Sequence, residues 1–177
     1  ECKSPYITNP MEAGIDQLLR YANRRTPEHN EGAEKLFHYN SMMVSTHRDK
    51  ARVGTITSRM EHYLEWKDPY PLTVEQLSAQ RATNASNDDN YESRRVAETQ
   101  LTYALPAPSS QDILLSGLFS KRNFLDVFQN FTVFEPVDGR IIKKIPRYQQ
   151  FRAVHKTIER LKEGETPKEK SGVIWHT

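Results

Sequence analysis

The chain has 177 residues, of which 36% are hydrophobic and 27% charged, and its formal net charge is +2. That length suits one full domain or parts of two. No apolar run approaches the roughly 20 residues of a membrane-spanning helix, and one cysteine excludes both an intrachain disulfide and a zinc site with several cysteines. The low apolar fraction indicates that a polar or irregular stretch dilutes the core.

An amphipathic helix is predicted over residues 9–24. Asn9 followed by Glu12 matches a capping box at the start of a helix. Gln17 and Tyr21, four residues apart, share one helix face. A second, apolar face has helical spacing and consists of Met11, Ile15, Leu18, Leu19 and Ala22.

The next part of the chain predicts a hairpin and then a boundary. Residues 36–46 and 51–57 are strand-like runs with a hairpin loop between them, and residues 58–66 have the pattern of a short amphipathic helix. Residues 77–110 are polar and end with prolines, so we interpret them as a linker or loop. This stretch is the candidate domain boundary, and it accounts for the low apolar fraction.

Regular structure is predicted again after residue 110. Two short helices begin at Ser110 and Ser120, and a hairpin over residues 132–145 turns at Asp138 and Gly139. A last helix begins at Pro146, and its apolar stripe consists of Phe151, Val154, Ile158 and Leu161. Residues 173–175 have the pattern of a short buried strand.

The basic run over residues 140–152 has two interpretations. Its five cations, with no acid between them, could follow a phosphate backbone, or they could form an ordinary solvated hairpin edge. The six histidines have no metal-ligand spacing, and we expect His155 to lie at the surface of its helix.

The first three residues form a Glu-x-Lys tripeptide. In a strand, residues two apart point the same way, so Glu1 and Lys3 would face one site. The carboxylate could hold Mg²⁺, and the ammonium could orient a water or stabilise charge on a phosphate. Such tripeptides are common by chance, and the alternative is a surface salt pair.

The helix that follows makes the tripeptide more informative. Gln17 can hydrogen-bond a base edge or a phosphate, and Tyr21 can stack or donate its hydroxyl. The alternatives are a solvated helix residue for Gln17 and a half-buried packing residue for Tyr21. A Glu-x-Lys strand, a capped helix and a Gln-x-x-x-Tyr pattern in this order are much rarer than any one of them.

This order resembles the second half of a PD-(D/E)xK nuclease site of the RecB-like type. More narrowly, the chain resembles the R subunit of type I restriction-modification enzymes, the ATP-dependent DNA translocase and endonuclease subunit. Residues 77–107 match no motif of that family. The blocks that carry the resemblance are residues 1–5, 16–21, 36–40, 51–56, 66–67, 112–115, 117–118, 130–135, 147–154 and 172–177.

The resemblance implies an α/β fold class with two parts. Residues 1–76 would be the C-terminal part of a restriction-endonuclease-like nuclease domain, residues 77–110 a linker or insertion, and residues 111–177 the N-terminal part of a RecA-like motor domain. The implied activity is that of a type I site-specific deoxyribonuclease, which hydrolyses double-stranded DNA with Mg²⁺ and couples this to ATP-driven translocation.

Site residues are carried over from the family position by position. Glu1 matches the metal-binding carboxylate, and Lys3 matches the catalytic lysine. Gln17 and Tyr21 match the pair that supports cleavage by contacting DNA or the catalytic lysine. The second metal-binding residue, an aspartate, would precede residue 1.

The motor part implies ATP as a second cofactor. Gln150, with Ala153 three residues later, best matches the glutamine that senses adenine in the family. Gln149 is the fallback. Residues 172–177 resemble the strand that enters a P-loop, and the P-loop would follow Thr177. We therefore expect the 177 residues to be a fragment that is inactive alone.

The resemblance also implies partners. They are double-stranded DNA and the modification and specificity subunits of a cytoplasmic restriction complex, with no membrane. One alternative is a stand-alone RecB-like nuclease fused to an unrelated DNA-binding or interaction domain. Another is a non-catalytic binding module in which Glu1 and Lys3 are a surface pair.

Overall fold

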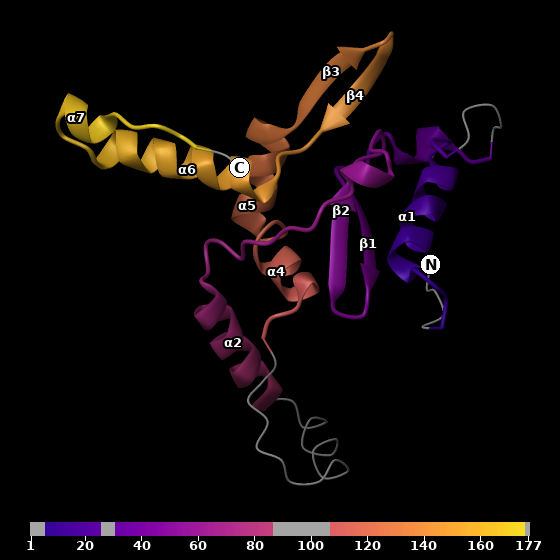
Figure 1. The fold of residues 1–177 in the computed structure, drawn as a ribbon, viewed down its shortest axis with the longest axis horizontal. Coiled ribbons are helices and arrows are strands. Elements are labelled where there is room, and N and C mark those ends of the chain that lie inside the picture. Colours follow the sequence, from indigo (N-terminus) through magenta and orange to yellow (C-terminus); the bar gives the residue numbers. More distant parts are fainter. Residues whose placement is uncertain (1–5, 26–30, 87–106, 176–177) are drawn as a thin grey trace.

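The computed structural model describes residues 6–25, 31–86 and 107–175. At its centre is an antiparallel hairpin of β1 (Met43–His47) and β2 (Lys50–Gly54), with α1 (Pro10–Tyr21) beside it (Figure 1). No helix in the described ranges is long and apolar enough to cross a membrane. The hairpin divides the apolar interior into two clusters, one on each of its faces.

Alternation along the two strands explains this division. Successive side chains of a strand point to opposite faces, and Met43 pairs with Gly54 while Val44 pairs with Val53. Met43 belongs to the cluster under α1, whereas Val44 and Val53 belong to the cluster on the other face. The turn between the strands contains Arg48 in a left-handed conformation, with φ of 52°.

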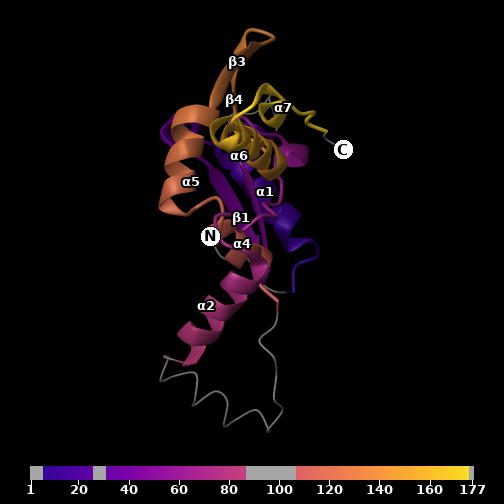
Figure 2. The ribbon, with the colours of Figure 1, turned by 90° about the vertical axis from the view of Figure 1, so that its left-hand side faces the viewer.

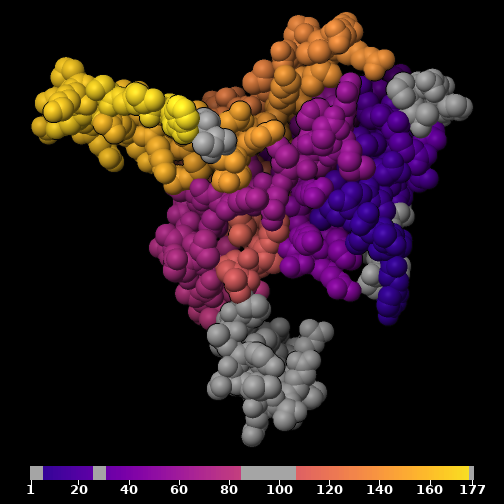
Figure 3. All heavy atoms as spheres, in the orientation of Figure 1, coloured from indigo at the N-terminus to yellow at the C-terminus, as the bar shows by residue number. Residues whose placement is uncertain are grey.

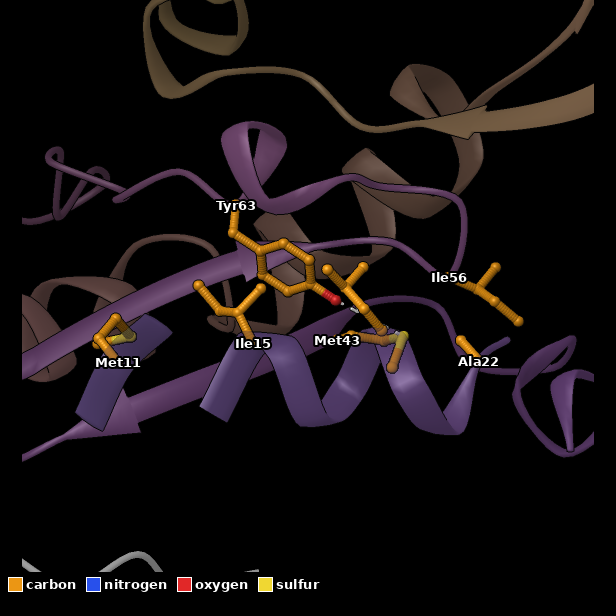
Figure 4. Close-up of a cluster of buried hydrophobic side chains, with 7 residues drawn as sticks. Met11, Ile15, Ala22, Met43, Ile56 and Tyr63 are labelled. Atoms are coloured by element: carbon orange, nitrogen blue, oxygen red, sulfur yellow. Dashed lines mark hydrogen bonds between the residues drawn. The ribbon is translucent and has the colours of Figure 1, made fainter. Parts of the chain in front are cut away.

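The predicted helix over residues 9–24 is confirmed as α1. Its buried residues, Met11, Ile15 and Leu19, belong to the predicted apolar stripe, and they share one cluster with Tyr63 and Met43 (Figure 4). Asn9 is in a left-handed conformation with φ of 52° and makes no side-chain cap, so the predicted capping box is wrong. A Cβ at Gly14 would lie 2.7 Å from Ser45 Oγ, which shows how closely α1 approaches β1.

Helices from the second half of the chain cover the other face of the hairpin. These are α4 (Ser110–Ser116), α5 (Lys121–Asp126), which continues as the π-helical turn η3 (Val127–Phe131), and α6 (Tyr148–Glu163). The chain before residue 77 and the chain after residue 110 therefore share one core. It consists of Ala51, Val53, Trp66, Leu114, Leu118, Val127 and Phe151.

The predicted hairpin over residues 132–145 is confirmed by β3 (Val133–Val137) and β4 (Arg140–Lys144). It projects from the body, as does the far end of α6 with the short α7 (Pro167–Lys170) (Figures 1 and 3). Thr55 Oγ1 donates to the Lys143 carbonyl at 2.8 Å, and the Lys143 N–H donates to Thr57 Oγ1 at 2.8 Å. These bonds fasten the base of the β3–β4 hairpin to the turn after β2.

Two local predictions in the first half are wrong in extent. Residues 36–46 form a strand only from Met43, because the 3₁₀ turn η1 (Glu34–Phe37) precedes it. The helix predicted over residues 58–66 is only the 3₁₀ turn η2 (Met60–His62). Leu64 exchanges backbone hydrogen bonds with Val53 at 2.9 and 3.0 Å, and this pairing keeps the following residues extended.

Two other predictions differ from the structure. The proposed linker begins with a helix, because α2 (Val74–Ser86) extends into it with Leu77 buried (Figure 2). Residues 87–106 of that prediction lie outside the described residues, residues 107–109 have no regular structure, and Ser110 already begins α4. The strand predicted at residues 173–175 does not form, and Trp175 is 83% exposed, because no neighbouring strand pairs with it in the described ranges.

Candidate active site

Gln17 and Tyr21 meet on α1, as their spacing predicts. Gln17 Nε2 donates a hydrogen bond to the Tyr21 hydroxyl, and both residues are half-buried. The Arg20 guanidinium carbon lies 5.2 Å from the centroid of the Tyr21 ring. The pair lies away from the buried stripe, so α1 uses one face for packing and presents an amide, a phenol and a cation on another.

The Glu1 and Lys3 predictions lie outside the described residues. In the described part of the chain, no group of three or more histidine, cysteine, aspartate or glutamate side chains could hold a metal ion. Glu1 is the predicted ligand of Mg²⁺, and its fit to a metal therefore stays a prediction.

A groove of about 1190 Å³ runs along α6 and under residues 172–175. Its lining includes Tyr148, Gln149 and Trp175. Aromatic rings and an amide suit a purine base, which they can stack on and hydrogen-bond. Five acidic and four basic side chains also line the groove, so its charge gives no preference for phosphate. The residues present fit the base of a nucleotide better than its phosphates.

The two candidate glutamines differ in placement. Gln150 is exposed, and its Oε1 accepts a hydrogen bond from the Arg147 backbone N–H at 2.9 Å, which caps the start of α6. Gln149 is half-buried and lines the groove. The position matched first by the family pattern thus caps the helix, while the fallback position lies in the groove.

One cluster has no signal in the sequence. Arg152 on α6 lies against Asp68 and Tyr70, which belong to the segment after the first hairpin. Asn123, which is 2% exposed, donates to the Tyr70 carbonyl at 2.5 Å. No spacing rule predicts contacts between residues so far apart in the chain.

The surface expectation for His155 is wrong. Its side chain is 19% exposed, and Nε2 lies 2.8 Å from Asp126 Oδ2. The ring also packs on Phe151, with centroids 4.4 Å apart, and stacks on Phe131. Of the predicted stripe of α6 only Phe151 is buried in the described chain, since Val154, Ile158 and Leu161 are 41%, 42% and 49% exposed. The contacts with Phe151 and Phe131 bring His155 to the edge of the core.

The basic run presents fewer charges than its composition indicates. Lys143 is 8% exposed and its Nζ donates to the Asn40 carbonyl at 2.9 Å. Burial lowers the pKa of Lys143. Lys144 forms an ion pair with Glu135, and Arg152 pairs with Asp68. Neither interpretation, a phosphate-binding run or a solvated hairpin edge, describes Lys143 and Arg152, which the fold uses in internal contacts.

Comparison with known proteins gives two relatives of one kind. The chain is 26% identical over 147 residues to the MjaIXP type I restriction enzyme endonuclease subunit of Methanocaldococcus jannaschii, covering 80% of this chain and 12% of that protein. It is 26% identical over 174 residues to the HindI type I restriction enzyme endonuclease subunit of Haemophilus influenzae, covering 97% of this chain and 14% of that protein.

No family model matches the chain, and no solved structure gives a significant match. The chain spans about an eighth of the length of the curated relatives it matches. Their shared description supports a role related to restriction.

Proposed function

We propose that this chain is a segment of the endonuclease and translocase subunit of a type I restriction enzyme. That subunit would cleave double-stranded DNA with Mg²⁺ and move along it by hydrolysing ATP. The main support is the similarity to a type I restriction enzyme endonuclease subunit over 97% of the chain. A match of this extent includes α1, both hairpins and α6, and is therefore not confined to one common motif.

The nuclease chemistry is assigned to the start of the chain. Glu1 would hold Mg²⁺, which supplies charge stabilisation at the phosphate and an activated water. Lys3 would stabilise charge that develops on the phosphate. Gln17 and Tyr21 would contact DNA or Lys3. Their pairing on a half-buried face of α1, separate from its packing face, supports this role.

The nucleotide is assigned to the groove along α6. Gln150, or Gln149 as the fallback, would read the adenine edge, and the aromatic rings of Tyr148 and Trp175 would pack on the base. The modification and specificity subunits would be the partners, and the specificity subunit would select the DNA site.

The test is Lys3→Ala in the full-length subunit assembled with its partner subunits. We expect DNA cleavage to fall by at least about 100-fold while ATP hydrolysis is retained, because Lys3 acts only on the scissile phosphate. Lys35→Ala, which removes an exposed lysine on η1, is the matched control. Cleavage at the parent rate by Lys3→Ala would contradict the proposal, and loss of both activities would make Lys3 structural.

The isolated 177-residue chain separates this proposal from its alternative. We expect it to show no Mg²⁺-dependent nicking of plasmid DNA, because the family pattern places a metal-binding aspartate and the P-loop on other segments. A stand-alone RecB-like nuclease would nick the plasmid under the same conditions.

A further inference from the structure

Tyr21 is the last residue of α1, and a helix holds its last residues less firmly than its middle. The last four carbonyls of a helix have no partner within it, so the final turn frays unless other groups bind them. In α1 these are the carbonyls of Leu18, Leu19, Arg20 and Tyr21. The groups that bind them therefore decide how firmly the Tyr21 side chain is placed.

The turn that follows α1 binds three of these carbonyls. The hydrogen bonds, from N–H to carbonyl, are Ala22 to Leu18 at 3.0 Å, Asn23 to Arg20 at 3.1 Å and Arg24 to Leu19 at 2.7 Å. This is the pattern of the Schellman motif, in which one residue takes a left-handed conformation and glycine is the usual choice. Asn23, with φ of 53°, has that conformation here.

The fourth carbonyl, that of Tyr21, is bound by a residue further along the chain. It accepts a hydrogen bond from the Ala33 N–H at 3.0 Å. The approach is close, because a Cβ added at Gly32 would lie 2.2 Å from the Tyr21 carbonyl oxygen and 2.4 Å from that of Arg20. Residues 32–33 therefore lie directly against the backbone of the last turn of α1.

The Asn23 side chain holds residues 32–33 in this position. Its Nδ2 donates to the Gly32 carbonyl at 3.1 Å, and its Oδ1 accepts from the Gly32 N–H at 2.5 Å. One side-chain amide thus binds both polar groups of a backbone residue, and the next residue donates to Tyr21. A glycine at position 23 could form the same turn, but it could not form this pair of hydrogen bonds.

Ion pairs surround the contact at its more exposed edge. They are Arg24 with Glu34 at 2.6 Å, Arg25 with Glu31 at 2.8 Å and Arg25 with Asp16 at 3.0 Å. Ion pairs near the surface contribute little, because solvent screens them and long side chains lose freedom in forming them. They join side chains, whereas the Asn23 amide binds the backbone beside the Tyr21 carbonyl.

We propose that Asn23 is a positioning residue for DNA cleavage and that its side-chain amide acts through Tyr21. This inference rests on the proposed function, in which Gln17 and Tyr21 contact DNA or the catalytic lysine. The amide holds residues 32–33 on the last turn of α1, and this turn keeps the Tyr21 hydroxyl beside Gln17. A misplacement of about 1 Å can cost about 100-fold in rate, so a small movement of this turn slows cleavage.

Asn23→Gly separates the role of the amide from that of the backbone, because glycine adopts the left-handed conformation without strain. The test uses the full-length protein with its partner subunits. We expect kcat for DNA cleavage to fall about tenfold, with KM for DNA and the rate of ATP hydrolysis each within about twofold of the parent. Both should be retained, because the proposed motor part and specificity subunit also bind DNA and the variant stays folded.

Two further variants accompany Asn23→Gly. Asp138→Gly is the matched control, since it replaces another short polar residue in a left-handed conformation, with φ of 49°, at the exposed tip of the β3–β4 hairpin. It should leave cleavage unchanged. Gly32→Ala places a Cβ against the Tyr21 carbonyl and should slow cleavage in the same direction as Asn23→Gly.

Hydrogen–deuterium exchange gives a readout that is independent of activity. The Gly32 N–H is bound by Asn23 and the Ala33 N–H by Tyr21, so exchange of both amides should rise by about tenfold or more in Asn23→Gly. Exchange of the amides within β1 should stay at the parent rate, because their contacts do not involve residue 23.

Four results would overturn the inference. They are cleavage by Asn23→Gly at the parent rate, a parallel loss of cleavage and ATP hydrolysis, a raised KM for DNA at unchanged kcat, and slower cleavage without faster exchange at residues 32–33. Lys3→Ala shows which proposal has failed. If Lys3→Ala cleaves normally, the proposed function is wrong. If it is inactive while Asn23→Gly cleaves at the parent rate, only the role of Asn23 is wrong.

Discussion

The hydroxyl of Tyr63 is a buried polar group in the core under α1. It donates to the sulfur of Met43 at 3.9 Å, and the residue is 3% exposed (Figure 4). Burial raises the pKa of Tyr63 to about 12, because the phenolate would lose its hydration in the core. The pH dependence of stability should therefore carry a contribution from this one residue.

We expect the free energy of unfolding to fall as the pH rises from about 10 to about 12. In this window the unfolded chain releases the Tyr63 proton while the folded chain keeps it, and below it both states keep the proton. Tyr63→Phe should remove this part of the fall. The lowered pKa of Lys143 has the opposite effect, because it makes the free energy of unfolding rise as the pH approaches about 10.5. Lys143 is present in both the parent and Tyr63→Phe, so its contribution cancels when the two are compared.

Urea unfolding of the parent and Tyr63→Phe at several pH values measures this difference. Equal pH slopes above about pH 10 in the two proteins would show that Tyr63 ionises in the folded state as readily as in the unfolded state.

The two glutamines at the start of α6 lead to a paired prediction. Gln149→Ala should weaken ATP binding by about tenfold, because its side chain lines the groove. Gln150→Ala should lower stability by about 0.5–1 kcal/mol, because it removes the bond to the Arg147 N–H. Two measurements on the full-length variants distinguish the two roles. Binding of a fluorescent ATP analogue reports on the groove, and melting curves report on stability. Weakened binding by Gln150→Ala alone would favour the position that the family pattern matches first.

At the scale of elements, the close approaches between segments constrain the sequence. Gly117 ends α4 with φ of −82°, which lies outside the left-handed region that favours glycine. A Cβ there would nevertheless lie 2.3 Å from the Asp68 carbonyl oxygen and 2.8 Å from Trp66 Nε1. The need for glycine at this position therefore comes from packing between the α4–α5 turn and residues 66–70.

Gly117→Ala should consequently destabilise the fold by about 1–3 kcal/mol through overpacking. Gly172→Ala is the matched control, since the nearest atom to its added Cβ would be 3.7 Å away on Arg160. Chemical unfolding of both variants checks the prediction. An equal loss of unfolding free energy in Gly117→Ala and Gly172→Ala would mean that the structure accommodates the added Cβ at residue 117 without strain.

At the scale of the whole molecule, the shared core joins the chain on both sides of residues 87–106. Trp66 from the first half lies 5.7 Å from Phe151 of the second, and Ser110 Oγ donates to the Ala51 carbonyl at 3.2 Å. Such contacts favour unfolding in one step. The division into a nuclease part and a motor part stays a prediction.

Phe151→Ala should lower the free energy of unfolding by about 3–5 kcal/mol, because the ring is fully buried and leaves a cavity between the two halves. Tryptophan fluorescence and helical circular dichroism should shift together. Val173→Ala, at a residue 91% exposed, should be neutral within about 0.5 kcal/mol. Two separate transitions, only one of them shifted, would show that the halves unfold independently.

The sequence by itself determined the elements whose signals are local. Both hairpins, α1 and most of α6 follow from side-chain periodicity and turn residues within a few positions of each other, and so does the meeting of Gln17 with Tyr21. The order of motifs also indicated the type I restriction relatives. Local predictions were wrong where a contact with another element decided the conformation. The helix predicted over residues 58–66 is an example, because Leu64 pairs with Val53 and keeps its segment extended.

Only the tertiary structure decided which distant residues meet. Tyr70 and Glu159, 89 positions apart, are joined by a hydrogen bond of 3.4 Å, and Arg152 reaches Asp68 across a similar separation. It also assigned Gln149 to the groove and Gln150 to the helix cap. The physical reason is that such contacts depend on which apolar faces are buried against one another, and the spacing of residues along a single element does not specify its partner.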